Sequence, residues 1–128
     1  MNKTLLIFLA FTTLANVIAA EGDTLDINSE PPHLTVETFD ELVIDRETNT
    51  LKGDKPWMIK FYAPWCGHCK RMAPVWTELF QKNKEEFNVA KVDCTQDEAK
   101  GLCSQFKVKG YPSVKLFNKD NKAYNFKR

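Results

Sequence analysis

Two cysteines separated by two residues stand where an apolar stretch gives way to a helical pattern, in the order Cys66-Gly67-His68-Cys69. Thiol–disulfide exchange needs a thiolate that attacks, a second thiol that resolves the mixed disulfide, and a scaffold that leaves the first thiol accessible. A cysteine at a helix N-terminus meets free N–H groups and the positive end of the helix dipole, which lower its pKa. The spacing therefore predicts Cys66 as the nucleophile and Cys69, nearly one turn further on and deeper, as the resolving thiol.

His68 lies between the two cysteines and adds to this chemistry. A neutral imidazole offers a hydrogen-bond donor to the Cys66 thiolate, and a protonated one offers a positive charge. Either form stabilises the reduced pair, and a pair with a stable reduced form is a stronger oxidant. We therefore expect the centre to favour giving disulfides to its substrates.

Three other interpretations of the pair fit the sequence less well. A zinc site needs a second Cys-x-x-Cys or paired histidines, whereas Cys94 and Cys103 are nine residues apart with no histidine near them. A c-type haem needs a histidine directly after the second cysteine, where Lys70 stands. A structural disulfide across so short a loop would restrain the unfolded chain little. We expect no metal and no cofactor.

The first twenty residues have the pattern of a secretory signal peptide, with Lys3, an apolar run over 5–14 and small residues up to Ala20. The alternative is an uncleaved anchor, but the uncharged stretch 4–20 is short for a membrane span. Removing residues 1–20, which hold one of the 18 basic side chains and none of the 17 acidic ones, leaves a neutral balance. We expect a disulfide-permissive compartment, no nucleic-acid partner and no membrane span in the mature chain.

The elements that position the cysteines follow from apolar periodicity. Residues 21–33 are polar and acidic and contain Pro-Pro, which predicts a flexible leader before a domain over 34–128. Residues 33–36 suggest a short edge strand, and 46–55 a surface loop. The helix expected between them starts with a capping box of Thr38 and Glu41, and it buries three apolar residues: Phe39, Leu42 and Val43.

The apolar run 56–63 predicts a central strand covered on both faces. The helix that starts at Cys66 carries an apolar stripe made of Met72, Val75, Trp76, Leu79 and Phe80. Pro74 lies inside this helix and should kink it.

The second half of the chain is expected to alternate in the same way. A strand covers 87–93, and strands cover 114–117 and 123–127 on either side of a turn at 118–121. Thr95 and Glu98 are expected to cap a helix whose inward residues are Ala99, Leu102, Cys103 and Phe106. Strands alternating with helices predict an α/β fold with helices on both faces of one sheet.

The residues around the cysteine pair also resemble a known family. Residues 61–70, Phe-Tyr-Ala-Pro-Trp-Cys-Gly-His-Cys-Lys, closely resemble the redox motif of protein disulfide isomerase domains, and 92–95 and 108–113 continue the match. The resemblance covers roughly 34–128. It implies a thioredoxin-like fold with a central mixed sheet flanked by helices. It also implies an enzyme of the endoplasmic reticulum lumen that forms, reduces or rearranges disulfides in folding secretory proteins, with unfolded or misbridged polypeptides and redox partner thiols as its partners.

The same resemblance assigns further site residues. Pro112 should be a cis-proline that faces the redox pair, and with Tyr111 and Trp65 it should hold a substrate peptide. The alternative for the two aromatic residues is ordinary packing. A chaperone-like module that binds clients through these residues, with weak redox activity, is the second function that the sequence leaves open.

The chain departs from the family at two places near the redox pair. Lys60 stands where the family usually has a buried acid that relays a proton for the second cysteine. Two interpretations remain open: a buried, neutral lysine accepts that proton instead, or the ammonium extends to solvent and takes no part. The family's arginine that assists the second cysteine aligns with Arg128. The sequence stops there, before the final helix that the resemblance implies, so we expect a fragment.

Cys94 and Cys103 match a region where related domains often carry a structural disulfide. A regular helix between them would separate their Cα atoms by about 12 Å. A disulfide tolerates only about 4.4–6.8 Å. A structural role is expected for both cysteines, and whether they bridge is left open.

Overall fold

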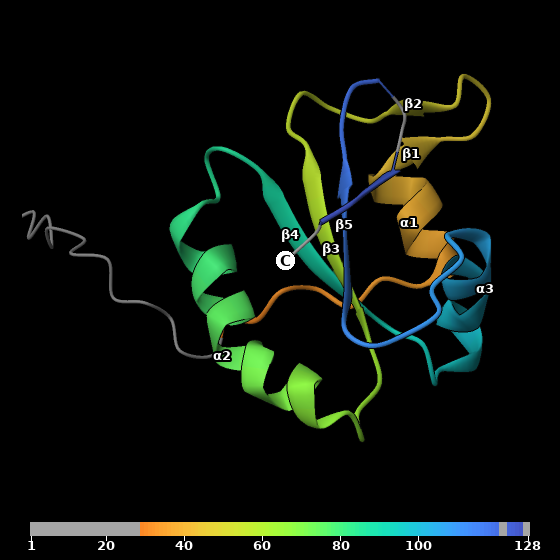
Figure 1. Ribbon diagram of the computed structural model, residues 1–128. Helices are drawn as coiled ribbons and strands as arrows, with labels where there is room; N and C mark the ends of the chain where they lie inside the picture. Colours follow the sequence, from red (N-terminus) through yellow and green to blue (C-terminus); the bar gives the residue numbers. More distant parts are fainter. Residues whose placement is uncertain (1–28, 121–122, 127–128) are drawn as a thin grey trace, which may run out of the picture.

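The computed structural model describes residues 29–120 and 123–126. Its elements, in chain order, are α1 (Val36–Leu42), β1 (Ile44–Asp45), β2 (Thr50–Leu51), β3 (Trp57–Tyr62), α2 (Gly67–Lys82), β4 (Asn88–Asp93), α3 (Asp97–Gln105), β5 (Ser113–Phe117) and β6 (Ala123–Asn125). The main sheet has the strand order β4-β3-β5-β6, in which β3 and β4 are parallel and the other pairs antiparallel. Figure 1 shows α2 on one side of this sheet and α1 and α3 on the other. The predicted α/β architecture with a mixed sheet is confirmed.

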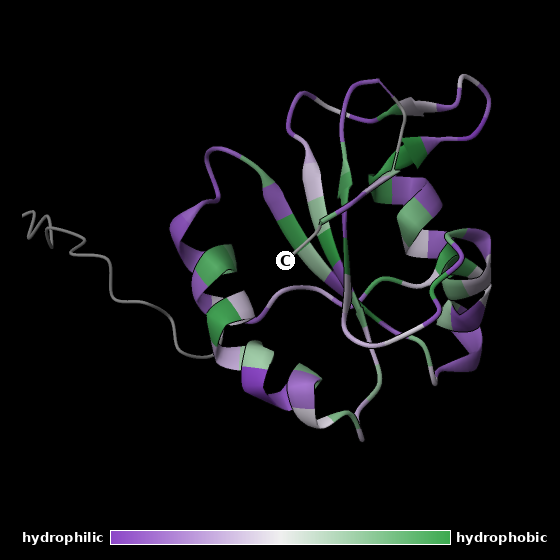
Figure 2. Ribbon diagram, in the orientation of Figure 1, coloured by the Kyte–Doolittle hydropathy of each residue, from purple (hydrophilic) through white to green (hydrophobic). Residues whose placement is uncertain are grey.

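The central strand β3 sends alternate side chains to the two faces of the sheet. Ile59 and Phe61 are fully buried and join the core cluster with residues of α1 and α3. Lys60 points to the opposite face, where its ammonium lies 5.8 Å from the ring centroid of Trp76 in α2. Figure 2 shows apolar residues along the strands and polar ones over much of the outer surface of the helices. The strand is therefore covered on both faces, as its apolar run predicted.

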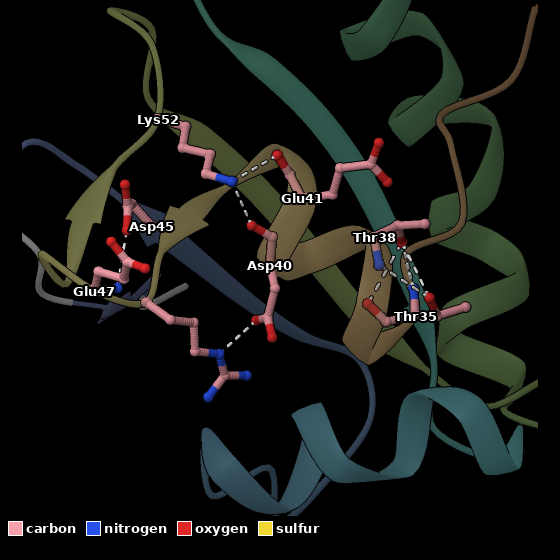
Figure 3. Close-up of polar contacts among 8 residues, drawn as sticks. Thr35, Thr38, Asp40, Glu41, Asp45, Glu47 and Lys52 are labelled. Carbon is pink, nitrogen blue, oxygen red and sulfur yellow. Dashed lines mark hydrogen bonds and ion pairs between the residues drawn. The ribbon is translucent and has the colours of Figure 1, made fainter.

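Helix α1 begins three residues earlier than the sequence indicated. Thr35 is the N-cap, and its hydroxyl accepts a hydrogen bond from the backbone N–H of Thr38 while the Thr38 hydroxyl accepts one from the N–H of Thr35. Figure 3 shows this reciprocal pair, and also Lys52, whose ammonium donates to the carbonyls of Asp40 and Glu41 near the end of the helix. The predicted Thr38–Glu41 capping box is therefore wrong.

The end of α1 also differs from the prediction in one residue. Phe39 and Val43 are buried as expected, but Leu42 is 46% exposed. The chain leaves the helix after Leu42 and pairs β1 with β2 in a two-stranded hairpin, so β2 lies within the range 46–55 that was expected to be a surface loop. Asp45 organises its turn by accepting hydrogen bonds from the backbone N–H groups of Glu47 and Thr48. Strands of two residues are too short to show an alternating pattern.

Helix α2 runs from Gly67 to Lys82 with Pro74 inside it. Figure 1 shows the helix changing direction along its length, which is the effect of a proline that removes one helical hydrogen bond. Trp76 anchors the helix to the sheet because its buried indole N–H donates to the carbonyl of Ala90 at 3.0 Å. Val75 was expected in the buried stripe but is 62% exposed. The helix packs mainly on β4, so only the centre of the apolar stripe is covered.

Residues 29–33, the described part of the expected leader, lie against the domain. His33 forms an isolated parallel bridge with Lys91, and the N–H of Leu34 donates to the Lys91 carbonyl at 2.9 Å. The edge strand expected over 33–36 is therefore reduced to one bridge beside β4. The remaining leader residues, the expected signal peptide and Arg128 lie outside the described residues.

Helix α3 follows β4 after a short turn. The expected capping role of Thr95 is wrong, because its N–H and its hydroxyl both donate to the Asp93 carboxylate at 2.9 and 2.7 Å. Gln96 occupies the N-cap without a side-chain cap bond. The inward residues of the helix are those predicted, and Phe106 joins an aromatic cluster with Phe39, Phe61 and Phe117. Within 29–120 and 123–126, no helix is long and apolar enough to cross a membrane.

Candidate active site

Cys66 is the N-cap of α2, at the turn that follows β3. The backbone enters this turn with a hydrogen bond from the Cys66 N–H to the Ala63 carbonyl and starts the helix with one from the Lys70 N–H to the Cys66 carbonyl, both at 3.1 Å. Because Cys66 has extended dihedral angles, its sulfur turns back over the first helical turn and accepts the N–H of Cys69 at 3.2 Å. The predicted placement of the pair at a helix start is confirmed, and the two thiols are not bonded to each other in this structure.

The surroundings of Cys66 favour its thiolate. The pKa of Cys66 is lowered, first by the hydrogen bond from the Cys69 thiol and then by the backbone N–H groups of Cys69 and His68. The Arg71 guanidinium adds a favourable charge, while burial acts in the opposite direction. These are the free N–H groups of a helix N-terminus, which stabilise an anion in their vicinity.

The surroundings of Cys69 act in the opposite direction and raise its pKa. It is 3% exposed, and burial is the first cause that raises its pKa, followed by its hydrogen bond with Cys66. The charge of a Cys66 thiolate raises it further, and the Lys60 ammonium opposes the shift. The surroundings therefore favour the thiolate of Cys66 and the protonated thiol of Cys69.

His68 and Arg71 form a polar contact on the exposed side of the first helical turn. The guanidinium Nη2 lies 2.6 Å from Nδ1 of His68. Arginine has no acceptor, so Nδ1 of His68 accepts in this contact. The sequence interpretation placed a potential positive charge on His68 and missed Arg71, although a basic residue three positions after His68 on a helix is a local signal for this contact.

Two aromatic side chains lie beside the pair, and one of them precedes a cis-proline. Trp65 is 71% exposed, and its ring meets the ring of Tyr111 edge to face with centroids 5.8 Å apart. Tyr111 also packs on the small cluster formed by the two cysteines and Ala63. The Tyr111–Pro112 peptide is cis, as the resemblance implied. The structure thus brings residues 65 and 111 together beside the redox pair.

A match to a family model agrees with this geometry. The model, described as Thioredoxin, matches residues 30–128. The chain belongs to the thioredoxin family. The thioredoxin-like fold expected from the sequence is confirmed, and the matched range reaches into residues 30–33, which lie against β4.

Relatives of this thioredoxin-family chain include protein disulfide isomerases. A probable protein disulfide-isomerase A6 from Medicago sativa is 38% identical over 115 residues, which are 87% of this chain and 30% of that protein. Protein disulfide-isomerase 1 from Dictyostelium discoideum is 38% identical over 124 residues, which are 94% and 29% of the two chains. The chain thus spans about 30% of the length of these relatives. The predicted resemblance to protein disulfide isomerase domains is confirmed.

A solved structure supports the same assignment. The crystal structure of the Trx4 domain of ERdj5 superimposes with a TM-score of 0.61 at 32% identity. The match covers 77% of this chain and 81% of that domain. The described fold therefore corresponds to nearly the whole of one thioredoxin domain.

Lys60 is the departure from the family that lies nearest the pair. Its side chain is buried, with 3% of the residue exposed, and its ammonium lies 5.3 Å from the ring centroid of Tyr62. Burial lowers the pKa of Lys60, and the neighbouring Lys91 lowers it further. Cys69 and Glu30 act in the opposite direction. The side chain is therefore not the solvent-exposed lysine of the second interpretation, and its role in proton transfer stays a prediction.

Cys94 and Cys103 form a disulfide in this thioredoxin-family chain, with their Cα atoms 5.9 Å apart. The separation of about 12 Å applied to a continuous helix. Cys94 instead follows strand β4, and α3 begins only at Asp97, so the intervening turn brings the two cysteines together. The bridge that the sequence left open is present and joins the end of β4 to α3.

Proposed function

We propose that this chain catalyses thiol–disulfide exchange in polypeptides, with Cys66 as the nucleophile and Cys69 as the resolving thiol. The observation that carries this proposal is the opposite bias of the two thiols, which share one hydrogen-bonded turn but have pKa values shifted in opposite directions. A thiolate is the attacking species in exchange, and a protonated second thiol does not compete with it.

The proposed reaction has two steps. The Cys66 thiolate attacks one sulfur of a substrate disulfide, which forms a mixed disulfide and releases the other substrate sulfur as a thiolate that takes up a proton. Cys69 then loses its proton and attacks the Cys66 sulfur, which forms the Cys66–Cys69 disulfide and releases the reduced substrate. In the reverse direction, the same steps transfer the Cys66–Cys69 disulfide to a substrate dithiol. If Cys69 does not attack, another substrate thiol can attack the mixed disulfide instead, which releases Cys66 and leaves the substrate with a rearranged disulfide.

We further propose that Lys60 accepts the proton that Cys69 must lose. Burial favours the neutral amine, which has a lone pair available for a proton. Once protonated, the ammonium stabilises the Cys69 thiolate that attacks. In this way a lysine would serve where the family usually has a carboxylate.

The proposed substrates are folding secretory polypeptides in the lumen of the endoplasmic reticulum. The signal-peptide pattern of residues 1–20 and the kinship with protein disulfide isomerases support this setting. The exposed Trp65, together with Tyr111 and Pro112, would hold an extended segment of such a substrate beside Cys66. Aromatic side chains that are exposed next to a reactive group commonly mark a recognition surface.

A trapping experiment tests the proposal. In Cys69→Ser, the resolving thiol is absent, so mixed disulfides between Cys66 and reduced, denatured substrate proteins should accumulate and should disappear on addition of a small thiol. Cys66→Ser is the matched control and should trap nothing. Substrate binding by Cys66→Ser/Cys69→Ser, without any mixed disulfide in Cys69→Ser, would contradict the enzyme and support the chaperone-like alternative.

A further inference from the structure

A cavity of about 620 Å³ lies on the side of the sheet that carries α2. It is bounded by α2, by one residue each of β3 and β4, and by residues 30 and 31. Part of the wall is apolar and includes Pro31, Pro74 and the face of Trp76. The volume is within the range of about 300–1,000 Å³ that is usual for small-molecule sites.

Four lysines face this cavity, and two of them have partners. The Lys91 ammonium lies 2.7 Å from the Glu30 carboxylate, and the Lys82 ammonium lies 2.5 Å from that of Glu78. Lys60 and Lys70 are the remaining two. Because both carboxylates of the wall are already paired, the cavity has an excess of positive charge.

Lys60 is the unusual member of this set, since it is almost fully buried. In the part of the chain that the structure describes, its ammonium has no carboxylate and no hydrogen-bond acceptor. The rings of Tyr62 and Trp76, at 5.3 and 5.8 Å, provide only cation–π contacts. The nitrogen of Lys60 opens onto the cavity, so its donors are free for an anionic ligand, and such a ligand would hold the amine in its charged form.

A second buried lysine in the same sheet has a hydrogen-bond acceptor for its ammonium. Lys115 of β5 is 6% exposed, and its ammonium donates to the Asn125 side-chain oxygen at 2.6 Å. It pairs with Ile59 across the β3–β5 ladder and so lies on the opposite face from Lys60. The fold therefore supplies an acceptor for one buried lysine and leaves the other facing an open cavity.

We propose that this cavity binds a small organic carboxylate, whose anionic group accepts a hydrogen bond from Lys60 and whose apolar part packs on Trp76 and Pro74. One buried ammonium matches one carboxylate group. An inorganic dianion would need more free donors, and it would leave the apolar wall unused. The site is separate from the Trp65 and Tyr111 surface, but it shares Lys60 with the proposed proton relay. A bound carboxylate would hold Lys60 in its charged form and so prevent it from accepting the proton of Cys69.

The test uses benzoate as the probe and the full chain. Isothermal titration calorimetry should show one saturable site, and benzoate should shift the indole ¹H–¹⁵N signal of Trp76. Lys60→Met keeps the length of the side chain and removes the ammonium, so it should weaken binding by at least about tenfold. Lys115→Met is the matched control and should bind benzoate as the unsubstituted chain does.

A second variant guards against an effect of Lys60→Met on folding. Ala73→Leu adds bulk to the cavity wall from an exposed position on α2 and should also weaken benzoate binding. Three results would each overturn the proposal: no saturable binding of benzoate, equal affinity in Lys60→Met, or inorganic phosphate binding as tightly as benzoate. The Cys69→Ser trapping result is independent of all three, so failure of this site and failure of the proposed function can be told apart.

Discussion

The backbone N–H of Cys69 donates to the sulfur of Cys66 at 3.2 Å, so the two redox residues are linked through the first turn of α2. A second link between the two thiols lowers the pKa of Cys66 and raises that of Cys69. Each thiol therefore sets the protonation state of the other. This mutual dependence leads to predictions in which a change at one cysteine is measured at its neighbour.

Replacing Cys69 by alanine should raise the pKa of Cys66, because the thiol that donates to its sulfur is lost. The pKa should stay below that of an ordinary cysteine, since the backbone N–H groups and Arg71 remain. The rate of alkylation by iodoacetamide, followed against pH, measures the change. The rate falls as the pH drops through the pKa, so the curve of Cys69→Ala should lie at higher pH. Cys69→Ser keeps a donor and should remain near the unsubstituted chain, and coincident curves for the two variants would contradict the prediction.

Removing the Lys60 amine should raise the pKa of Cys69, because the ammonium that forms when this amine takes up a proton favours the Cys69 thiolate. Cys69 is buried, so the ¹³Cβ chemical shift in a Cys66→Ala background is a better probe than alkylation. Lys60→Met should move the titration to higher pH. Lys115→Met changes the other buried lysine, on the opposite face, and should leave it in place.

The same lysine should affect the pH profile of dithiol oxidation. In Lys60→Glu, a carboxylate replaces the amine as proton acceptor, and a carboxyl group titrates at a lower pH than an amine. The acidic limb of the pH profile should therefore move to lower pH in Lys60→Glu. An unchanged profile would show that Lys60 takes no part in proton transfer at Cys69.

The parts of the fold that the sequence predicted are those with a long local pattern. Strand β3 has a continuous apolar run and α2 a helical stripe, so the predicted bounds of the strand and the predicted start of the helix lie close to those observed. The cap of α1 was misplaced because both Thr35 and Thr38 are residues that favour this position, and the backbone around Thr35 decides between them. The β1–β2 hairpin has strands too short to leave a pattern.

The candidate active site was likewise predictable only where its pattern is local. The spacing of Cys66 and Cys69 is local and specific, and it identified the pair. The ion pair between Glu30 and Lys91 joins residues 61 positions apart, and it depends on the segment that runs beside β4. No periodicity or motif encodes such a contact, so the surroundings of Lys60 became visible only in the folded chain.

The disulfide between Cys94 and Cys103 should stabilise the domain by about 2–3 kcal/mol, the value expected for a loop of this length. The measurement is urea unfolding of Cys94→Ala/Cys103→Ala in a Cys66→Ser/Cys69→Ser background, so that no other cysteine is present. The double alanine variant should lose that amount of unfolding free energy. Treatment of the background chain with a reducing agent should cause a similar loss, and a change well below 1 kcal/mol would mean that the bridge contributes little.

Trp65 should contribute to the binding of polypeptide substrates and little to stability, because its ring is largely exposed and its partner Tyr111 is held by the core. An aromatic contact of this kind is worth roughly 0.5–1.5 kcal/mol, so Trp65→Ala should lower kcat/KM for a peptide disulfide by about two- to tenfold. Exchange with a small disulfide, which cannot reach the ring and the cysteine together, should change much less. Phe126→Ala removes another exposed aromatic residue, next to the edge strand β6, and should leave both rates unchanged. Equal losses for the peptide and the small disulfide in Trp65→Ala would instead assign Trp65 to the support of Cys66.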